Sequence, residues 1–197
     1  MQTHPLKRFV LSVTALLAMS MVAPAAHASY SDYILTDSPI GYWRLGEAGG
    51  PTAFDASGNA RDLTYTNFTV PGDFGQAGAT VDGDTAVKLT PNGSSPHPQL
   101  RAGNTSDFGF ASGQSFSIEY WINAAPGNST TANAGLITKG YDDAQVQPWY
   151  LSRYNPGGTV DFFLRGPDKV ATSVTDVDDG QWHHVVVRYD GSRAASG

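Results

Sequence analysis

The strongest strand pattern in the chain is the stretch SFSIEYWIN, residues 115–123. Every second side chain from Phe116 to Ile122 is apolar or aromatic. Successive side chains of a β-strand point to opposite faces, so this alternation predicts a strand with one buried face. A second long strand is predicted for WHHVVVRY, residues 182–189, which is rich in β-branched and aromatic residues.

Shorter strand signals recur on both sides of these two stretches. We expect strands at residues 40–45, 62–66, 86–90, 135–139, 149–154, 159–165 and 170–174. Turn clusters separate them, for example PNG at 91–93 and NPGG at 155–158. Many short strands divided by turns predict an all-β sandwich or barrel. The only stretch with a helical appearance is the apolar segment near the N-terminus.

That N-terminal segment has the layout of a secretory signal peptide. Lys7 and Arg8 precede an apolar run at 9–22, and the small residues that follow end in A-x-A form at Ala28. A membrane anchor is the alternative, but it needs about 20 apolar residues. We therefore predict cleavage after residues 1–28, and a protein that is secreted, extracellular or at the cell surface and is not integral to a membrane.

Composition narrows the range of partners and the source of stability. The chain has no cysteine, so a core or a bound ion must stabilise residues 29–197, which have the length of one domain. The formal net charge is −6. Nucleic acid and anionic membranes attract a basic surface, so we expect neither as a partner.

Four segments together resemble one family. They are PIGYWRLGE at 39–47, DASGN at 55–59, FSIEYWI at 116–122, and DGQWHHV at 179–185, which runs on to YDG at 189–191. Their order and spacing resemble the laminin G-like family of the concanavalin A-like superfamily. The resemblance implies two antiparallel sheets packed face to face as a jelly-roll sandwich, with ligand or calcium sites on edge loops.

The C-terminal end departs from the family pattern. Family members usually continue beyond YDG with a hairpin and a closing strand, whereas this chain ends at Gly197. We therefore expect the domain at 29–197 to lack the last strands of the sandwich, as a C-terminally truncated domain would.

Residue patterns of the enzymes that share this fold are missing from the sequence. Glycoside hydrolysis needs two carboxylates beside the bond, and the related glucanases carry them as E-x-D-x-x-E on one strand. The only glutamates are Glu47 and Glu119, in separate strand segments. The Arg-rich strand of jelly-roll lyases and the G-x-S-x-G elbow are also absent. We expect a protein that is not an enzyme.

Calcium is the ion that the sequence favours, because aspartates are frequent in the predicted loops. Most of them fit equally well as solvated turn residues. The resemblance singles out Asp55 and Asn59, since the family's corresponding loop often lies beside a calcium site. His183 and His184 are adjacent on one strand and therefore point to opposite faces, which argues against a shared zinc ion.

A loop before one predicted strand is the candidate ligand site. It contains Tyr141, Asp142 and Asp143 and leads to Trp149, whose ring either packs in the core or stacks on a sugar. We expect a non-catalytic extracellular module that binds carbohydrate, an extracellular glycoprotein or a matrix component. A structural or adhesive domain of a surface protein, and an accessory domain of a larger secreted glycoside hydrolase, remain as alternatives, because one sandwich serves many functions.

Overall fold

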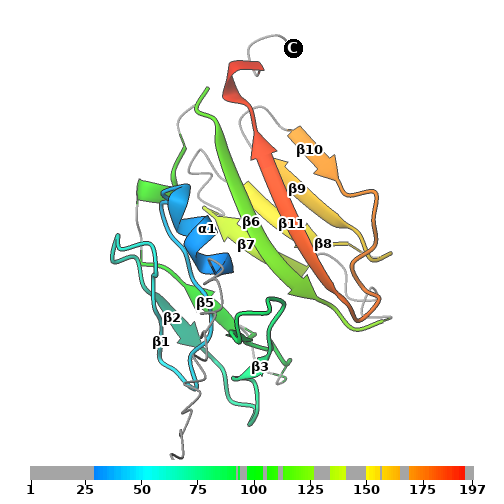
Figure 1. The fold of residues 1–197 in the computed structure, drawn as a ribbon. Helices are drawn as coiled ribbons and strands as arrows, with labels where there is room; N and C mark the ends of the chain where they lie inside the picture. The colour runs from blue at the N-terminus through cyan, green and yellow to red at the C-terminus, as the bar shows by residue number, and fades with distance from the viewer. Residues whose placement is uncertain are drawn as a thin grey trace, which may run out of the picture.

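The structure is a computed structural model that describes residues 29–91, 93, 97–103, 106–110, 113–126, 134–140, 150–155, 157–164 and 169–193. These residues form four antiparallel sheets and little helix (Figure 1). The longest strands are β6 (Phe116–Asn123) and β11 (Trp182–Tyr189), which pair along their whole length. The apolar side chains of β6 alternate with exposed ones, as its sequence predicts.

A four-stranded sheet lies behind this pair, in the order β10-β9-β8-β7 (Figure 1). Its strands are β7 (Ala134–Lys139), β8 (Tyr150–Tyr154), β9 (Val160–Leu164) and β10 (Lys169–Thr172). All neighbouring strands are antiparallel, and the β7–β8 register shifts between Gly135 and Ile137.

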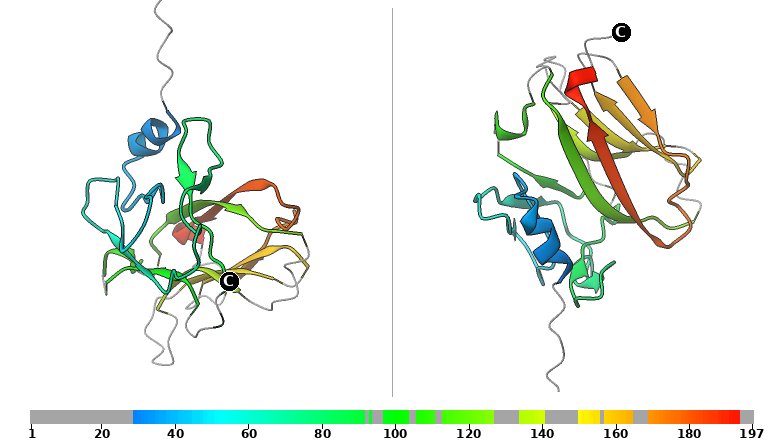
Figure 2. Two further views of the ribbon diagram at one scale, coloured as in Figure 1. Left: turned by 90° about the horizontal axis from the view of Figure 1, so that it is seen from below. Right: turned by 45° about the horizontal axis from the view of Figure 1, so that its top comes forward.

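The core lies between these two sheets. Phe162 and Leu164 of β9 are buried against Phe116 and Ile118 of β6 and Val187 of β11. Farther along the sheets, a second buried cluster contains Tyr154 and Val160, against which Ile122 and Val185 pack. Two sheets that share one apolar core in this way form an antiparallel β-sandwich (Figure 2).

A smaller group of strands precedes the sandwich in the chain. It contains β1 (Thr52–Ala53), β2 (Leu63–Thr66) and β5 (Gln99–Arg101), in the order β1-β2-β5. A separate pair joins β3 (Gln76–Ala77) to β4 (Thr85–Ala86). The described residues also include two short 3₁₀ helices, η1 (Ser106–Phe108) and η3 (Gly191–Arg193).

One helix, α1 (Tyr30–Thr36), lies beside β6 (Figure 1). Ser29 and Asp32 form a capping box at its start, in which each side chain accepts a hydrogen bond from the backbone N–H of the other residue. This helix contradicts the expectation that no helix follows the N-terminal apolar segment. The Tyr30 ring meets Trp121 and His184 edge-on, at centroid distances of 6.1 and 6.4 Å.

Two predicted strands are also wrong in part. Residues 40–45 form only an isolated bridge between Trp43 and Asp55, because side-chain hydrogen bonds hold this segment in place of a backbone ladder. Of residues 86–90, only Ala86 belongs to a strand. The strands predicted at 62–66, 115–123, 135–139, 149–154, 159–165, 170–174 and 182–189 are confirmed to within one or two residues.

Candidate functional site

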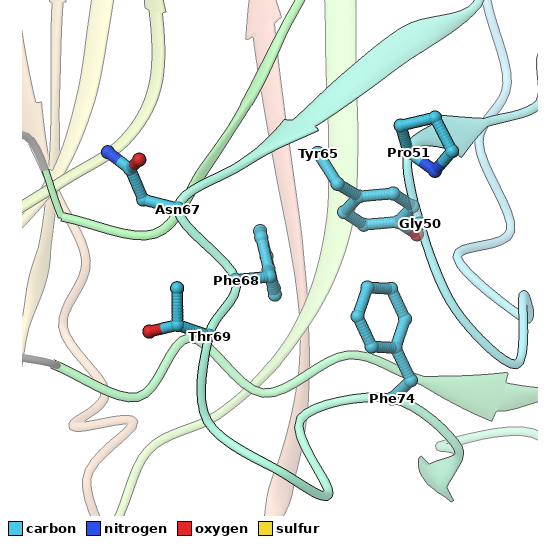
Figure 3. Close-up of a pocket in the computed structure, with 7 residues that line it drawn as sticks. All are labelled: Gly50, Pro51, Tyr65, Asn67, Phe68, Thr69 and Phe74. Carbon is cyan, nitrogen blue, oxygen red and sulfur yellow. The ribbon is translucent and has the colours of Figure 1, made fainter.

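A pocket of about 510 Å³ opens where β2 ends. Three aromatic side chains, those of Tyr65, Phe68 and Phe74, form its apolar wall (Figure 3). The remaining lining residues are Gly50, Pro51, Asn67 and Thr69. The chain reaches this geometry because Tyr65 is the buried residue of β2, and the residues that follow it turn the chain towards Phe74.

The three rings contact one another with their faces inclined. Tyr65 stands edge-on to Phe68, with centroids 5.0 Å apart, and edge-on to Phe74, with centroids 4.9 Å apart. Phe68 and Phe74 are tilted by 42° at 5.4 Å. Edge-to-face pairs at these distances are favourable and limit ring motion. The pocket therefore has preformed aromatic walls.

Glu47 fixes the position of Tyr65. Its Oε2 accepts a hydrogen bond from the Tyr65 hydroxyl at 2.7 Å, and its Oε1 accepts one from the Phe54 N–H at 2.9 Å. Burial, and then the neighbouring Glu47 carboxylate, raise the pKa of Tyr65 far above its ordinary value. Tyr65 is consequently neutral at physiological pH, and Glu47 links the segment after β1 to β2.

No lining residue of this pocket carries a charge at neutral pH. The side chains of Asn67 and Thr69 lie on the other side of the backbone from the Phe68 ring (Figure 3). Asn67 has a φ of 62°, in the left-handed region, which turns the chain directly after the β2–β5 ladder ends at Thr66. The lining thus combines three aromatic side chains with two polar residues, Asn67 and Thr69.

The loop at 55–59 is held by Asp55. Its Oδ1 accepts hydrogen bonds from the Tyr42 and Ser57 N–H groups, and its Oδ2 accepts one from the Arg61 N–H, each at 2.9 Å. Burial would raise the pKa of Asp55, but the hydrogen bonds from Tyr42, Ser57 and Arg61 outweigh burial and lower it. The carboxylate thus joins the opening segment of the domain to this loop.

Asn59 makes the complementary contacts. Its Nδ2 donates to the carbonyl oxygens of Pro39 at 3.1 Å and Ile40 at 3.0 Å. Calcium at Asp55 would have to compete with the three N–H groups that its carboxylate already accepts. Among the described residues, no three His, Cys, Asp or Glu side chains gather where they could hold a metal ion. The calcium prediction at Asp55 and Asn59 gains no support from this arrangement and stays a prediction.

Tyr141, Asp142, Asp143 and Trp149 lie outside the described residues. His184 stacks on Trp121 on the exposed face of the β6–β11 sheet, with centroids 4.7 Å apart.

His183 lies on the opposite face of β11, where its Nε2 is 2.9 Å from Asp179 Oδ1.

The pocket of Tyr65, Phe68 and Phe74 was not predicted from the sequence. Its signal is the closely spaced aromatic set within residues 65–74.

Two antiparallel sheets around one core define the class as an antiparallel β-sandwich. The laminin G-type family profile described as the concanavalin A-like lectin/glucanases superfamily matches residues 82–196. The match covers more than half of the chain, and the chain belongs to this superfamily. The pocket residues precede residue 82 and so lie outside the matched span.

No curated protein and no solved structure matches the chain significantly. Within the part of the chain that the structure describes, no helix is both long enough and apolar enough to cross a bilayer.

Proposed function

We propose that this protein is a secreted, non-catalytic recognition module that binds neutral carbohydrate in the pocket of Tyr65, Phe68 and Phe74. The observation that carries the proposal is the preformed aromatic wall of a pocket whose lining residues are uncharged. The C–H face of a pyranose ring packs against such a wall, and its hydroxyl groups need hydrogen-bond partners at the edge. The polar residues of the lining are Asn67 and Thr69.

Because no charged residue lines the pocket, we expect its sugar ligand to be neutral. A sialic acid, uronic acid or sulfated sugar would lose hydration on entering without gaining a cationic partner from any lining residue. A neutral hexose or N-acetylhexosamine loses no charge solvation. Membership of a superfamily named for lectins and glucanases agrees with a carbohydrate ligand.

The non-catalytic part of the proposal rests on the positions of the carboxyl groups, because no Asp or Glu lines the pocket. Glu47 is occupied by the Tyr65 hydroxyl and the Phe54 N–H. Glu119 lies on the exposed face of β6, beside His184 at 3.5 Å, in a different part of the fold. A glycosidase needs two carboxyl groups on either side of one bond, at about 5–9 Å from each other.

The test is a glycan-array screen of the full chain, with Phe68→Ala and Phe54→Ala as paired variants. Phe54 is 62% exposed and is not among the residues that line the pocket, so it is a matched control. We expect neutral glycans to bind, Phe68→Ala to weaken affinity by roughly tenfold or more, and Phe54→Ala to leave it unchanged. Binding restricted to acidic glycans, or equal loss in both variants, would contradict the proposal.

A second function is favoured by a different surface. Val186 is 56% exposed on the outer face of the β6–β11 sheet, and Trp121 is 37% exposed beside it. Exposed apolar side chains that lie together often mark protein-binding surfaces. A folded sample that binds no glycan would therefore favour the structural or adhesive alternative.

A further inference from the structure

Asp73 is the most deeply buried ionisable side chain among the described residues, at 1% exposure. Its Oδ1 accepts a hydrogen bond from the Thr90 hydroxyl at 2.7 Å. Its Oδ2 is buried and has no hydrogen-bond partner within the described part of the chain. Asp73 Oδ2 is therefore removed from water without gaining a hydrogen bond in return.

The backbone prevents Asp73 from moving out to solvent. Its N–H donates to the Val70 carbonyl at 3.3 Å across a turn in which Gly72 has a φ of 86°. Its carbonyl oxygen accepts a hydrogen bond from the Lys88 N–H at 2.7 Å. The position of Asp73 is thus fixed from both sides, by the turn and by the segment that leads to Thr90.

A buried carboxylate without a partner is costly, and proteins normally pair such a group with a cation or a set of donors. No cationic side chain of the described residues forms an ion pair with Asp73. Hard cations bind carboxylate, hydroxyl and backbone carbonyl oxygens, and Asp73 and Thr90 place the first two kinds together.

We propose that Asp73 Oδ2 anchors a buried site for a hard cation such as Ca²⁺, with the Thr90 hydroxyl beside it as a further ligand. This site is distinct from Asp55 and Asn59. Phe74 follows Asp73 directly and packs on Tyr65 and Phe68, so the cation fixes one wall of the pocket. The effect of the cation on the pocket rests on the proposed carbohydrate function, whereas the cation site itself does not.

The test is thermal unfolding of the full chain after removal of metal with EDTA and dialysis. CaCl₂, MgCl₂ and NaCl are then titrated at matched ionic strength into the wild type, Asp73→Asn and Asp37→Asn. Asp37 is exposed at the end of α1, so its variant controls for the loss of one charge. At a free Ca²⁺ concentration of about 100 times Kd, we expect Tm to rise by roughly 5–10 °C in the wild type and in Asp37→Asn. We expect no rise in Asp73→Asn.

A third variant keeps the test decisive if Asp73→Asn does not fold. Thr90→Val retains the carboxylate but removes the hydroxyl beside it, and should weaken Ca²⁺ affinity by roughly tenfold or more. The cation site is overturned if no cation raises the Tm of the wild type, or if Asp73→Asn or Thr90→Val responds like the wild type.

Sugar binding separates the cation site from its link to the pocket. The link predicts that glycan affinity falls when Ca²⁺ is chelated. A Ca²⁺-dependent Tm combined with glycan affinity that is unchanged by EDTA would overturn the link alone. Absence of glycan binding combined with a Ca²⁺-dependent Tm would overturn the carbohydrate function and leave the cation site standing.

Discussion

Asp55 shows how one side chain can replace a strand pairing. The opening segment of the domain has a single bridge to the loop at 55–59, and Asp55 supplies the other contacts by accepting three backbone N–H groups. Charge-assisted hydrogen bonds to a carboxylate are stronger than neutral ones. In this chain, the aspartate of the DASGN motif holds the loop at 55–59 in place through these hydrogen bonds.

Replacing Asp55 should destabilise the domain. In Asp55→Asn the amide nitrogen cannot accept the Arg61 N–H, so one backbone donor loses its partner. We expect the free energy of unfolding to fall by about 1–3 kcal/mol in urea titrations at neutral pH. Asp37→Asn, at an exposed position, should change it by less than about 0.5 kcal/mol. An Asp55→Asn protein as stable as the wild type would refute this role.

The same residue predicts a pH dependence. The pKa of Asp55 is lowered in the folded state, so the folded chain binds fewer protons at this site than the unfolded chain does. The resulting stability is present above the ordinary carboxyl pKa of 3.8 and is lost as pH falls through the folded value. Between about pH 5 and about pH 2, the wild type should therefore lose more stability than Asp55→Asn. Parallel losses in chemical unfolding would contradict this assignment.

At the scale of elements, α1 contacts the β6–β11 sheet through an aromatic residue, Tyr30. Tyr30 meets the Trp121–His184 stack edge-on, and its hydroxyl lies 3.5 Å from His184 Nε2, at the limit of a hydrogen bond. The remaining side chains of the helix include the exposed Tyr33 and Leu35.

Tyr30→Ala should release α1 from the β6–β11 sheet. Loss of the two ring contacts should cost roughly 1–2 kcal/mol, expose Trp121 and shift its fluorescence to longer wavelength. Tyr30→Phe is the matched control, since it keeps the ring, and it should resemble the wild type. Equal spectra for all three proteins would show that α1 does not depend on this contact.

Strands in which apolar and polar residues alternate could be predicted from the sequence. Strands too short to show this alternation could not. β6, β9 and β11 each carry enough alternating or β-branched residues to signal a strand alone. The strands β1, β3, β4 and β5 have two or three residues each, too few to show a period. The helix α1 had a usable signal in the capping box of Ser29 and Asp32, which the search for apolar periodicity overlooked.

At the scale of the whole molecule, the two large sheets stabilise each other through one core. Phe162 of β9 packs against Phe116 of β6, with centroids 6.3 Å apart, and it is buried. Among the described residues, the side of each sheet that carries Phe162 or Phe116 is covered by the other sheet. Loss of this core contact should therefore affect both sheets together.

Phe162→Ala should lower the free energy of unfolding by about 3–5 kcal/mol, because it leaves a cavity between the sheets. Val186→Ala, at a half-exposed position of β11, should cost less than about 1 kcal/mol. Urea unfolding followed by tryptophan fluorescence and far-ultraviolet circular dichroism checks both values. A small effect of Phe162→Ala would mean that the sheets do not share this core.

The site was less predictable than the fold because it is assembled from segments with different structural causes. Tyr65 belongs to a strand, Phe68 to the turn after it, and Phe74 to a loop fixed by Asp73. No spacing rule links such residues, and the match to the superfamily begins after them. The fold follows from periodic patterns that repeat along the chain, whereas the pocket needs the tertiary structure.

The measurement that tests the carbohydrate proposal most directly is nuclear magnetic resonance of the aromatic side chains in the wild-type chain. Methyl glucoside, methyl galactoside and N-acetylglucosamine would be added separately at millimolar concentration. We predict that at least one of them shifts the ring signals of Tyr65, Phe68 and Phe74 and leaves those of Phe54 and Phe162 unchanged. Shifts confined to other residues, or no shift with any of the three sugars, would contradict a neutral-sugar site in this pocket.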